Sequence, residues 1–189
     1  SNDYNFHEQL EEIGASVLVL DHHITDEKIS DNAVIINNQL SPNYKNKDLC
    51  GAGITWQFCR YLDWYFKSDN TNADKYMDLA AWGIIGDMGS MIEMENRYIV
   101  YEGLQEKNIK NTFLKVLLEK QAYSITGNQY AKWSDICEAV NAISIAFYIV
   151  PMVNAMIRVG TMPEKERLFM AFIDGSQMVP CNKRGAKGT

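Results

Sequence analysis

Two short aliphatic runs near the start of the chain constrain its fold more than any other feature. "SVLVL" (16–20) and "AVIINN" (33–38) have the length of strands and are rich in β-branched residues. Continuous apolar runs of this kind are typical of strands that are buried on both faces of a parallel sheet. "NFHEQLEEIG" (5–14) precedes them, with apolar residues at helical spacing and a glycine at its end. We therefore expect the chain to begin as an α/β layer.

The rest of the sequence is mainly helical in its pattern. After a polar loop over 39–50, apolar residues recur at helical spacing. Helices are predicted over 53–66, over 73–88, over two segments within 96–119, over 134–160 with an interruption at Pro151, and from "TMPE" (161–164) to about 173. The fold class is therefore predicted to be α/β, with a parallel-sheet domain over 1–130, a helical extension of the core over 131–175 and a basic tail or linker over 176–189.

Composition narrows the class of protein. The 189 residues are 47% hydrophobic and 22% charged, with a net charge of −6, which is ordinary for a globular chain. The acidic balance argues against a general, nonspecific nucleic-acid coat, while a local basic path is compatible with it. No apolar run approaches the roughly 20 residues that cross a bilayer, so we expect no membrane contact and a cytoplasmic location. The four cysteines lack metal-finger spacing and are expected to be reduced; they are Cys50, Cys59, Cys137 and Cys181.

The first aliphatic run ends in an acid and two adjacent histidines, Asp21, His22 and His23, and the chain has only one other histidine. In open parallel sheets, ligands bind just beyond the carboxyl ends of the strands, which is where these residues fall. Imidazole with carboxylate suits divalent cations such as Mn²⁺. Of two neighbouring residues at a strand end, one can face a metal and the other a substrate oxygen. Two loop histidines beside a capping aspartate are the alternative interpretation.

Two further acids are candidates for the same site. Asp3 stands before the first predicted helix, one β–α step before Asp21, and would lie at the same sheet edge if a strand preceded it. Asp87 is the single acid in the apolar stretch "LAAWGIIGDMGSM" (79–91). Burying a lone carboxylate costs several kcal/mol unless it is paired or binds a metal, so Asp87 needs a partner. A helix-terminal cap near the flanking glycines is the alternative.

In combination, these features resemble the DHH phosphoesterase family and, within it, the RecJ-like single-strand-specific exonucleases. Five blocks match in the family's order: "VLVLDHH" (17–23), "AVIINN" with "LCGAGITWQF" (33–58), "DLAAWGIIGDMGSMIEMENR" (78–97), "YEGL" (101–104) and "AFYIVPMVNAMIRVG" (146–160). The last block is similar to the family's segment of Pro, then Asn-Ala and Arg-x-Gly. The resemblance covers most of residues 15–175 and implies that the α/β layer is a DHH-type domain.

The resemblance also implies roles for the residues at the strand end. His22 and Asp87 would be catalytic metal ligands for Mn²⁺ or Mg²⁺, and Asp3 matches the bridging aspartate of the family's second motif. His23 would be the catalytic histidine that contacts the substrate phosphate, with Asp21 supporting the histidines from behind. Divalent ions in such a site activate a water and neutralise charge at phosphorus.

The last block supplies two further substrate residues. Asn154 and Arg158 match the asparagine and arginine that lie near the substrate phosphate in this family, and a guanidinium suits a bidentate phosphate contact. Ile157 replaces the glycine that usually precedes this arginine. The polar run at 95–97 is interpreted as a structural ion-pair and hydrogen-bond group.

The resemblance implies phosphodiester hydrolysis by the core of a 5′–3′ exonuclease, with single-stranded DNA as partner and a single-strand-binding protein as a further candidate partner. The family's first strand with its DxD-type motif, and its C-terminal GGH-like motif, do not occur in the sequence. We therefore expect a fragment with weak or no activity by itself. The alternatives are a DHH phosphodiesterase for short oligonucleotides or cyclic dinucleotides and a non-catalytic DHH module; the oligomeric state is open. The four tryptophans are typical of helix cores, with base stacking as the alternative: Trp56, Trp64, Trp82 and Trp133.

Overall fold

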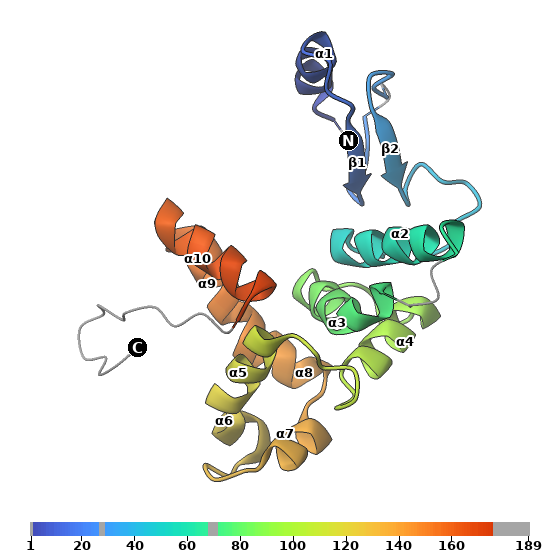
Figure 1. Ribbon diagram of the computed structural model, residues 1–189. Helices are drawn as coiled ribbons and strands as arrows, with labels where there is room; N and C mark the ends of the chain where they lie inside the picture. The colour runs from blue at the N-terminus through green and yellow to red at the C-terminus, as the bar shows by residue number, and fades with distance from the viewer. Residues whose placement is uncertain (1, 27–28, 68–71, 176–189) are drawn as a thin grey trace. The chain divides into compact units, whose positions relative to one another are not determined.

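The computed structural model describes residues 2–26, 29–67 and 72–175 (Figure 1). Its contacts divide the chain into two compact units, Ser1–Asn108 and Ile109–Thr189. The predicted tail over 176–189 lies outside the described residues.

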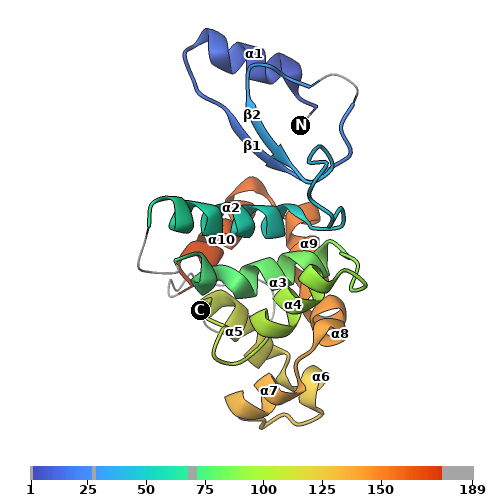
Figure 2. The same cartoon turned by 90° about the vertical axis from the view of Figure 1, so that its right-hand side faces the viewer.

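The first unit contains a two-stranded parallel sheet and helices. Its elements are α1 (Tyr4–Glu12), β1 (Leu18–Asp21), β2 (Val34–Asn37), α2 (Gly51–Tyr65), the 3₁₀ turn η1 (Ala73–Tyr76), α3 (Met77–Gly86) and α4 (Met94–Gly103). β1 and β2 pair in register from Leu18 opposite Val34 to Asp21 opposite Asn37. α2 lies across the carboxyl ends of both strands (Figures 1 and 2). The predicted α/β class with a mainly helical remainder is confirmed.

The two strands are less buried than their sequences predicted. Leu18 and Val34, at the amino ends, are 49% and 65% exposed. Within the described residues the sheet has only these two strands, so each has a single hydrogen-bonded neighbour and little sheet interior exists. The expectation of strands buried on both faces is therefore wrong for this chain.

Helix α3 forms the centre of the first unit because small residues let its neighbours approach closely. Most of its side chains are buried, including Trp82 and Ile84. A Cβ built at Gly83 would lie only 2.4 Å from the Cβ of Ala52 in α2, and one at Gly103 of α4 would lie 2.6 Å from the Cβ of Ala81. This packing brings the end of α3 beside the beginning of α2.

The second unit is entirely helical in its described part. It comprises α5 (Thr112–Lys120), α6 (Ala122–Thr126), α7 (Trp133–Ala139), α8 (Ala142–Ser144), the π-helical turn η2 (Ile145–Ile149), α9 (Val150–Val159) and α10 (Met162–Ile173). Leu114, Leu118 and Ile145 are completely buried in its core. Glu164 accepts a hydrogen bond from the Thr161 N–H at 2.9 Å, which confirms the predicted capping box of the last helix. The unit begins at Ile109, and within it α5 and α6 pack against α7 and α5 packs against α10.

The interruption predicted at Pro151 lies elsewhere. Pro151 occupies the first turn of α9, where its missing N–H is tolerated, and the helix runs through it. The break occurs at Val140, where Asn141 begins the next helix by accepting hydrogen bonds from the Ile143 and Ser144 N–H groups. The local side-chain cap, rather than the proline, sets this boundary.

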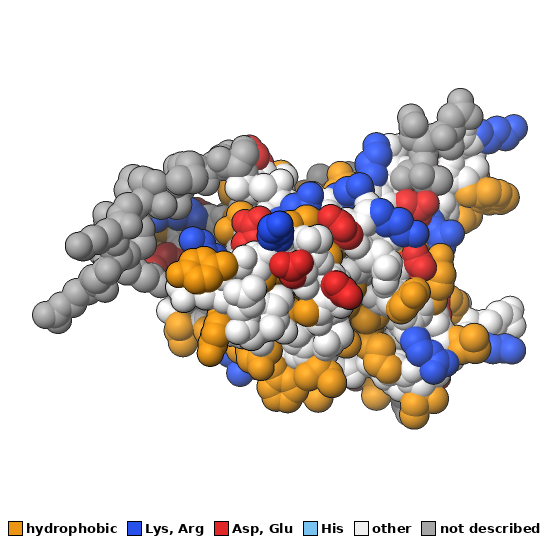
Figure 3. Space-filling model, turned by 90° about the horizontal axis from the view of Figure 1, so that it is seen from below, with side chains coloured by type: hydrophobic (Ala, Val, Ile, Leu, Met, Phe, Trp, Pro, Cys, Tyr) orange, Lys and Arg blue, Asp and Glu red, His pale blue; other side chains and the backbone are white. Residues whose placement is uncertain are grey.

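The helical stretch Ala142–Val159 is apolar and mostly exposed. By length and composition alone, this stretch could cross a membrane, although a single helix of this kind is weak evidence of a membrane span. The expectation that no apolar run is long enough is therefore wrong. Phe147 is 72% exposed and Ile143 is 70% exposed. Figure 3 shows hydrophobic, acidic and basic side chains interspersed over the face that it presents.

Candidate active site

The candidate site lies at the carboxyl end of β1, where one carboxylate organises both histidines. Asp21 Oδ1 accepts hydrogen bonds from the backbone N–H groups of His22 at 2.8 Å and His23 at 3.2 Å. The same oxygen lies 2.7 Å from His23 Nδ1. Because Nδ1 of His23 is held by Asp21, Nε2 is the ring nitrogen left to face other groups. The side chain of His23 is 76% exposed, whereas that of Asp21 is 13% exposed.

Two amide side chains hold the backbone of the histidines from the neighbouring segment. Asn37, at the end of β2, donates from Nδ2 to the carbonyl oxygen of His23 at 3.0 Å. Gln39 donates from Nε2 to the carbonyl oxygens of His22 at 3.2 Å and Lys47 at 2.7 Å. The sequence reasoning missed both residues. Asn37 lies opposite Asp21 in the register of the sheet, which the sequence alone does not give.

Asp87 reaches the same place from the end of α3. Its Oδ2 lies 3.5 Å from His22 Nδ1, and the two side chains are 51% and 24% exposed, respectively. This separation exceeds that of a good N–H···O hydrogen bond. The distance between the two atoms is close to the roughly 3 Å that separates neighbouring metal ligands when each lies about 2.1 Å from one octahedral ion.

The environment of Asp87 differs from the expectation in one respect. Asp87 is not buried, because it terminates α3 and the following Met88 turns the chain away with a φ of 57°. The helix-terminal position, which was the alternative interpretation, therefore occurs, whereas the burial that would require a partner does not. His22 nevertheless lies beside Asp87.

The beginning of α2 closes the site from another side. A Cβ at Gly51 would lie 3.5 Å from His22 Cδ2, an ordinary contact. Burial raises the pKa of the neighbouring Cys50 thiol, backbone N–H groups oppose this, and the charge of Asp87 raises the pKa further. Cys50 therefore stays protonated at neutral pH and is not an activated nucleophile. Among the described residues no disulfide joins Cys50, Cys59 and Cys137, and Cys181 lies outside the described residues.

Asp3 lies at the start of α1 and is exposed. The residues beside it contact the segment after the histidines: Tyr4 Oη donates to Asp26 Oδ2 at 2.7 Å. Asp3 does not complete a ligand set with His22 and Asp87. Throughout 2–26, 29–67 and 72–175, no three His, Cys, Asp or Glu side chains are grouped so that they could hold a metal ion.

Asn154 and Arg158 lie in the second unit. Both are exposed on α9. Four residues apart, they share one face of the helix and lie about 6 Å apart along its axis, so one phosphate could contact both side chains. They are not placed relative to His22 and Asp87, which belong to the first unit.

Glu95 is the centre of a structural hydrogen-bond network, as expected for the polar run at 95–97. Its carboxylate accepts from Tyr44 Oη at 2.6 Å, Asn46 Nδ2 at 2.9 Å and Gln57 Nε2 at 2.6 Å. Asn96 is completely buried and donates to the carbonyl oxygens of Asp48 and Ser90. Arg97 is exposed and does not share this burial. The network holds the loop between β2 and α2.

Comparison with known proteins identifies relatives along the whole chain. YorK, a prophage protein of Bacillus subtilis named as a candidate single-strand DNA-specific exonuclease, is 38% identical over 189 residues, which is 100% of this chain and 30% of YorK. Single-stranded-DNA-specific exonuclease RecJ of Thermus thermophilus is 29% identical over 162 residues, 86% of this chain and 22% of that protein. RecJ of Haemophilus influenzae is 26% identical over 170 residues, 86% of this chain and 28% of that protein. The chain is homologous to a segment of RecJ-like exonucleases.

The RecJ-like resemblance inferred from the five blocks is thus confirmed. No family model and no solved structure matches the chain. The chain spans less than a third of the length of these relatives.

Proposed function

We propose that this chain provides part of the catalytic core of a metal-dependent, 5′–3′ single-strand DNA exonuclease. The observation that carries the proposal is the approach of His22 and Asp87 to 3.5 Å from two elements that are far apart in sequence. The similarity to proteins named as single-strand DNA-specific exonucleases, over 86% to 100% of the chain, supports it.

His22 and Asp87 would hold a divalent cation, Mn²⁺ or Mg²⁺. Imidazole and carboxylate donors fit such ions in type. They supply two ligands, so the site is incomplete in the described residues, and further ligands would come from water or from outside them. Bound ions would supply an activated water and neutralise charge on the phosphate.

The chain's own residues would orient the substrate. Asp21 holds Nδ1 of His23, so that Nε2 of its imidazolium form could donate to a phosphate oxygen. Asn37 and Gln39 keep the backbone of both histidines in place. Asn154 and Arg158 would contact a substrate phosphate from α9.

Calorimetric titration with Mn²⁺ tests the proposal. We expect binding by the parent chain that is lost in His22→Ala and in Asp87→Ala. Asp31→Ala is the matched control, because this exposed acid precedes β2 and so lies at the opposite end of the sheet. Binding by both site variants that equals the parent's would contradict the proposal, as would a loss in the control of the same size.

A digestion assay tests the direction and extent of hydrolysis. With single strands labelled at either end, this chain is expected to release label slowly or not at all, with any release starting at the 5′ end. Rapid Mn²⁺-dependent digestion would contradict the expected weakness of the isolated segment. Preference for cyclic dinucleotides or very short oligonucleotides would instead indicate a phosphodiesterase.

A further inference from the structure

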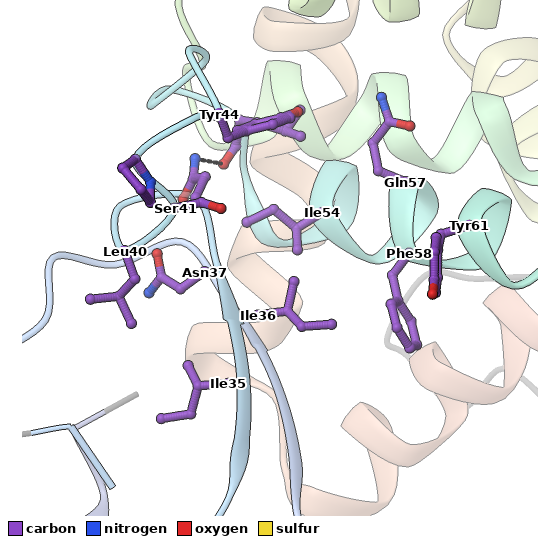
Figure 4. Close-up of a pocket in the computed structure, with 13 residues that line it drawn as sticks. Ile35, Ile36, Asn37, Leu40, Ser41, Tyr44, Ile54, Gln57, Phe58 and Tyr61 are labelled. Atoms are coloured by element: carbon purple, nitrogen blue, oxygen red, sulfur yellow. Dashed lines mark hydrogen bonds between the residues drawn. The ribbon is translucent and has the colours of Figure 1, made fainter. Parts of the chain in front are cut away.

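A cavity of about 490 Å³ opens in the first unit between β2, the segment that follows it and α2 (Figure 4). Sites for small organic ligands have volumes of about 300 to 1,000 Å³. The cavity is therefore large enough for one planar heterocycle. None of the functional residues proposed above lines it except Asn37.

The walls of the cavity are mainly apolar and include two aromatic rings. Ile35 and Ile36 lie on the β2 side, and Phe58 and Tyr61 lie on the α2 side (Figure 4). The rings of Phe58 and Tyr61 are stacked, with centroids 6.5 Å apart and an angle of 26° between their planes. Tyr61 is 49% exposed, so its ring is accessible to a ligand. Aliphatic and aromatic walls of this kind suit the flat face of a nucleobase.

The polar end of the cavity is held rigid by the Glu95 network. Tyr44 and Gln57, which line this end, both donate to the Glu95 carboxylate, at 2.6 Å each. Asn38 donates to the carbonyl oxygens of Asn46, Lys47 and Leu49, and its buried Oδ1 accepts no hydrogen bond within the described residues. Rigid walls lower the ordering cost of binding.

The cavity adjoins the candidate active site. Asn37 lines the cavity and also donates to the carbonyl oxygen of His23. α2 begins near His22, since a Cβ built at Gly51 would lie 3.5 Å from His22 Cδ2. The same helix contributes Ile54, Phe58 and Tyr61 to the cavity from one face. Phe58 and Tyr61 lie about 10 to 15 Å along α2 from Gly51, so a strand with one phosphate at His23 would bring the base of a nucleotide further along the strand to these rings.

We infer that this cavity binds one base of single-stranded DNA by stacking on Phe58 and Tyr61. The inference rests on the proposed function and adds a base-binding subsite to it. Every base has a π face, so binding by stacking tolerates any sequence. The subsite positions the strand and takes no part in bond cleavage.

Equilibrium binding of a short fluorescent thymidine oligonucleotide, measured in EDTA, tests the inference. Tyr61→Ala is expected to weaken binding about tenfold, the loss of one stacked base. Tyr98→Ala is the matched control: Tyr98 is 57% exposed on α4, does not line the cavity, and its loss should change affinity less than twofold. An abasic oligonucleotide of the same length should bind the parent as weakly as the thymidine strand binds Tyr61→Ala.

Several outcomes would overturn the inference: no binding by the parent chain, equal affinities for the parent and Tyr61→Ala, or equal affinities for abasic and thymidine strands. The titration with Mn²⁺ separates this failure from failure of the proposed function. Tyr61-dependent binding without Mn²⁺ binding would leave the base subsite standing and remove the metal site. If Mn²⁺ binding needs His22 and Asp87 but oligonucleotide binding does not depend on Tyr61, the metal site stands and the base subsite is removed.

Discussion

The proposed functional residues are held by hydrogen bonds at the end of β1 in the first unit, but they are exposed on α9 in the second unit. Asp21 and Asn37 fix His22 and His23 through four hydrogen bonds at 2.7–3.2 Å. Arg158, in contrast, lies on an exposed helix whose apolar neighbours are also exposed. Hydrogen bonds therefore preorganise the proposed metal site at the strand end, whereas the proposed phosphate contact at Arg158 rests on an exposed side chain.

The largest effect is expected in the core of the second unit. Ile145→Ala removes a completely buried side chain and should lower the free energy of unfolding by about 2–5 kcal/mol, because a cavity is left behind. The control Ile143→Ala, at a position that is 70% exposed in the same stretch, should change it by less than about 0.5 kcal/mol. Denaturant titration measures both. Equal losses would show that the exposed face of this stretch is covered in solution.

A smaller effect is expected where α2 and α3 pack in the first unit. Gly83→Ala places a Cβ 2.4 Å from that of Ala52 and should cost about 1–3 kcal/mol through overpacking. It should also weaken Mn²⁺ binding, since Asp87 lies one turn further along. Gly51→Ala, whose Cβ meets only an ordinary contact at 3.5 Å, is the control for stability. Unchanged stability in Gly83→Ala would show that the helices are not packed this closely.

The same comparison explains how much could be read from the sequence. The strands and the position of the histidines follow from the apolar runs, so they could be predicted from the residues. The meeting of His22 with Asp87 was implied by the family resemblance. Asn37 and Gln39 could not, because a side-chain amide that binds a distant carbonyl depends on strand register and loop path. The helix break at Val140 was missed because Asn141 capping outweighs a proline that fits a first helical turn.

The Glu95 network gives the first unit a dependence on alkaline pH. Burial, followed by the hydrogen bond to Glu95, raises the pKa of Tyr44 well above its ordinary value. Because the pKa of Tyr44 is higher in the folded than in the unfolded state, its contribution to the free energy of unfolding is fully present below pH 10. This contribution is lost as the pH rises above about 10, the pKa of tyrosine in the unfolded chain. Tyr44→Phe should abolish this loss. Urea titrations at pH 8 and above pH 10 measure it, and identical slopes against pH in parent and variant would contradict the network.

The smallest effect on stability is expected on α9. Arg158→Ala should change the free energy of unfolding by less than about 0.5 kcal/mol, because the side chain is exposed. It should nevertheless weaken single-strand binding and reduce the slope of log affinity against log salt by about 0.7, the loss of one phosphate contact to a single strand. Arg167→Ala, an exposed arginine on α10, is the control with an unchanged slope. Equal slopes for both variants and the parent would remove Arg158 from the phosphate site.

Paramagnetic broadening by Mn²⁺ in the amide NMR spectrum tests most directly whether His22 and Asp87 share one ion. At substoichiometric Mn²⁺, the signals of His22, His23, Asp87 and Met88 should broaden first, and EDTA should restore them. The signals of Asp31 and Asn32, at the amino end of β2, should stay sharp. Broadening centred on other acidic residues, or unchanged signals at His22 and Asp87, would contradict a metal site at the end of β1.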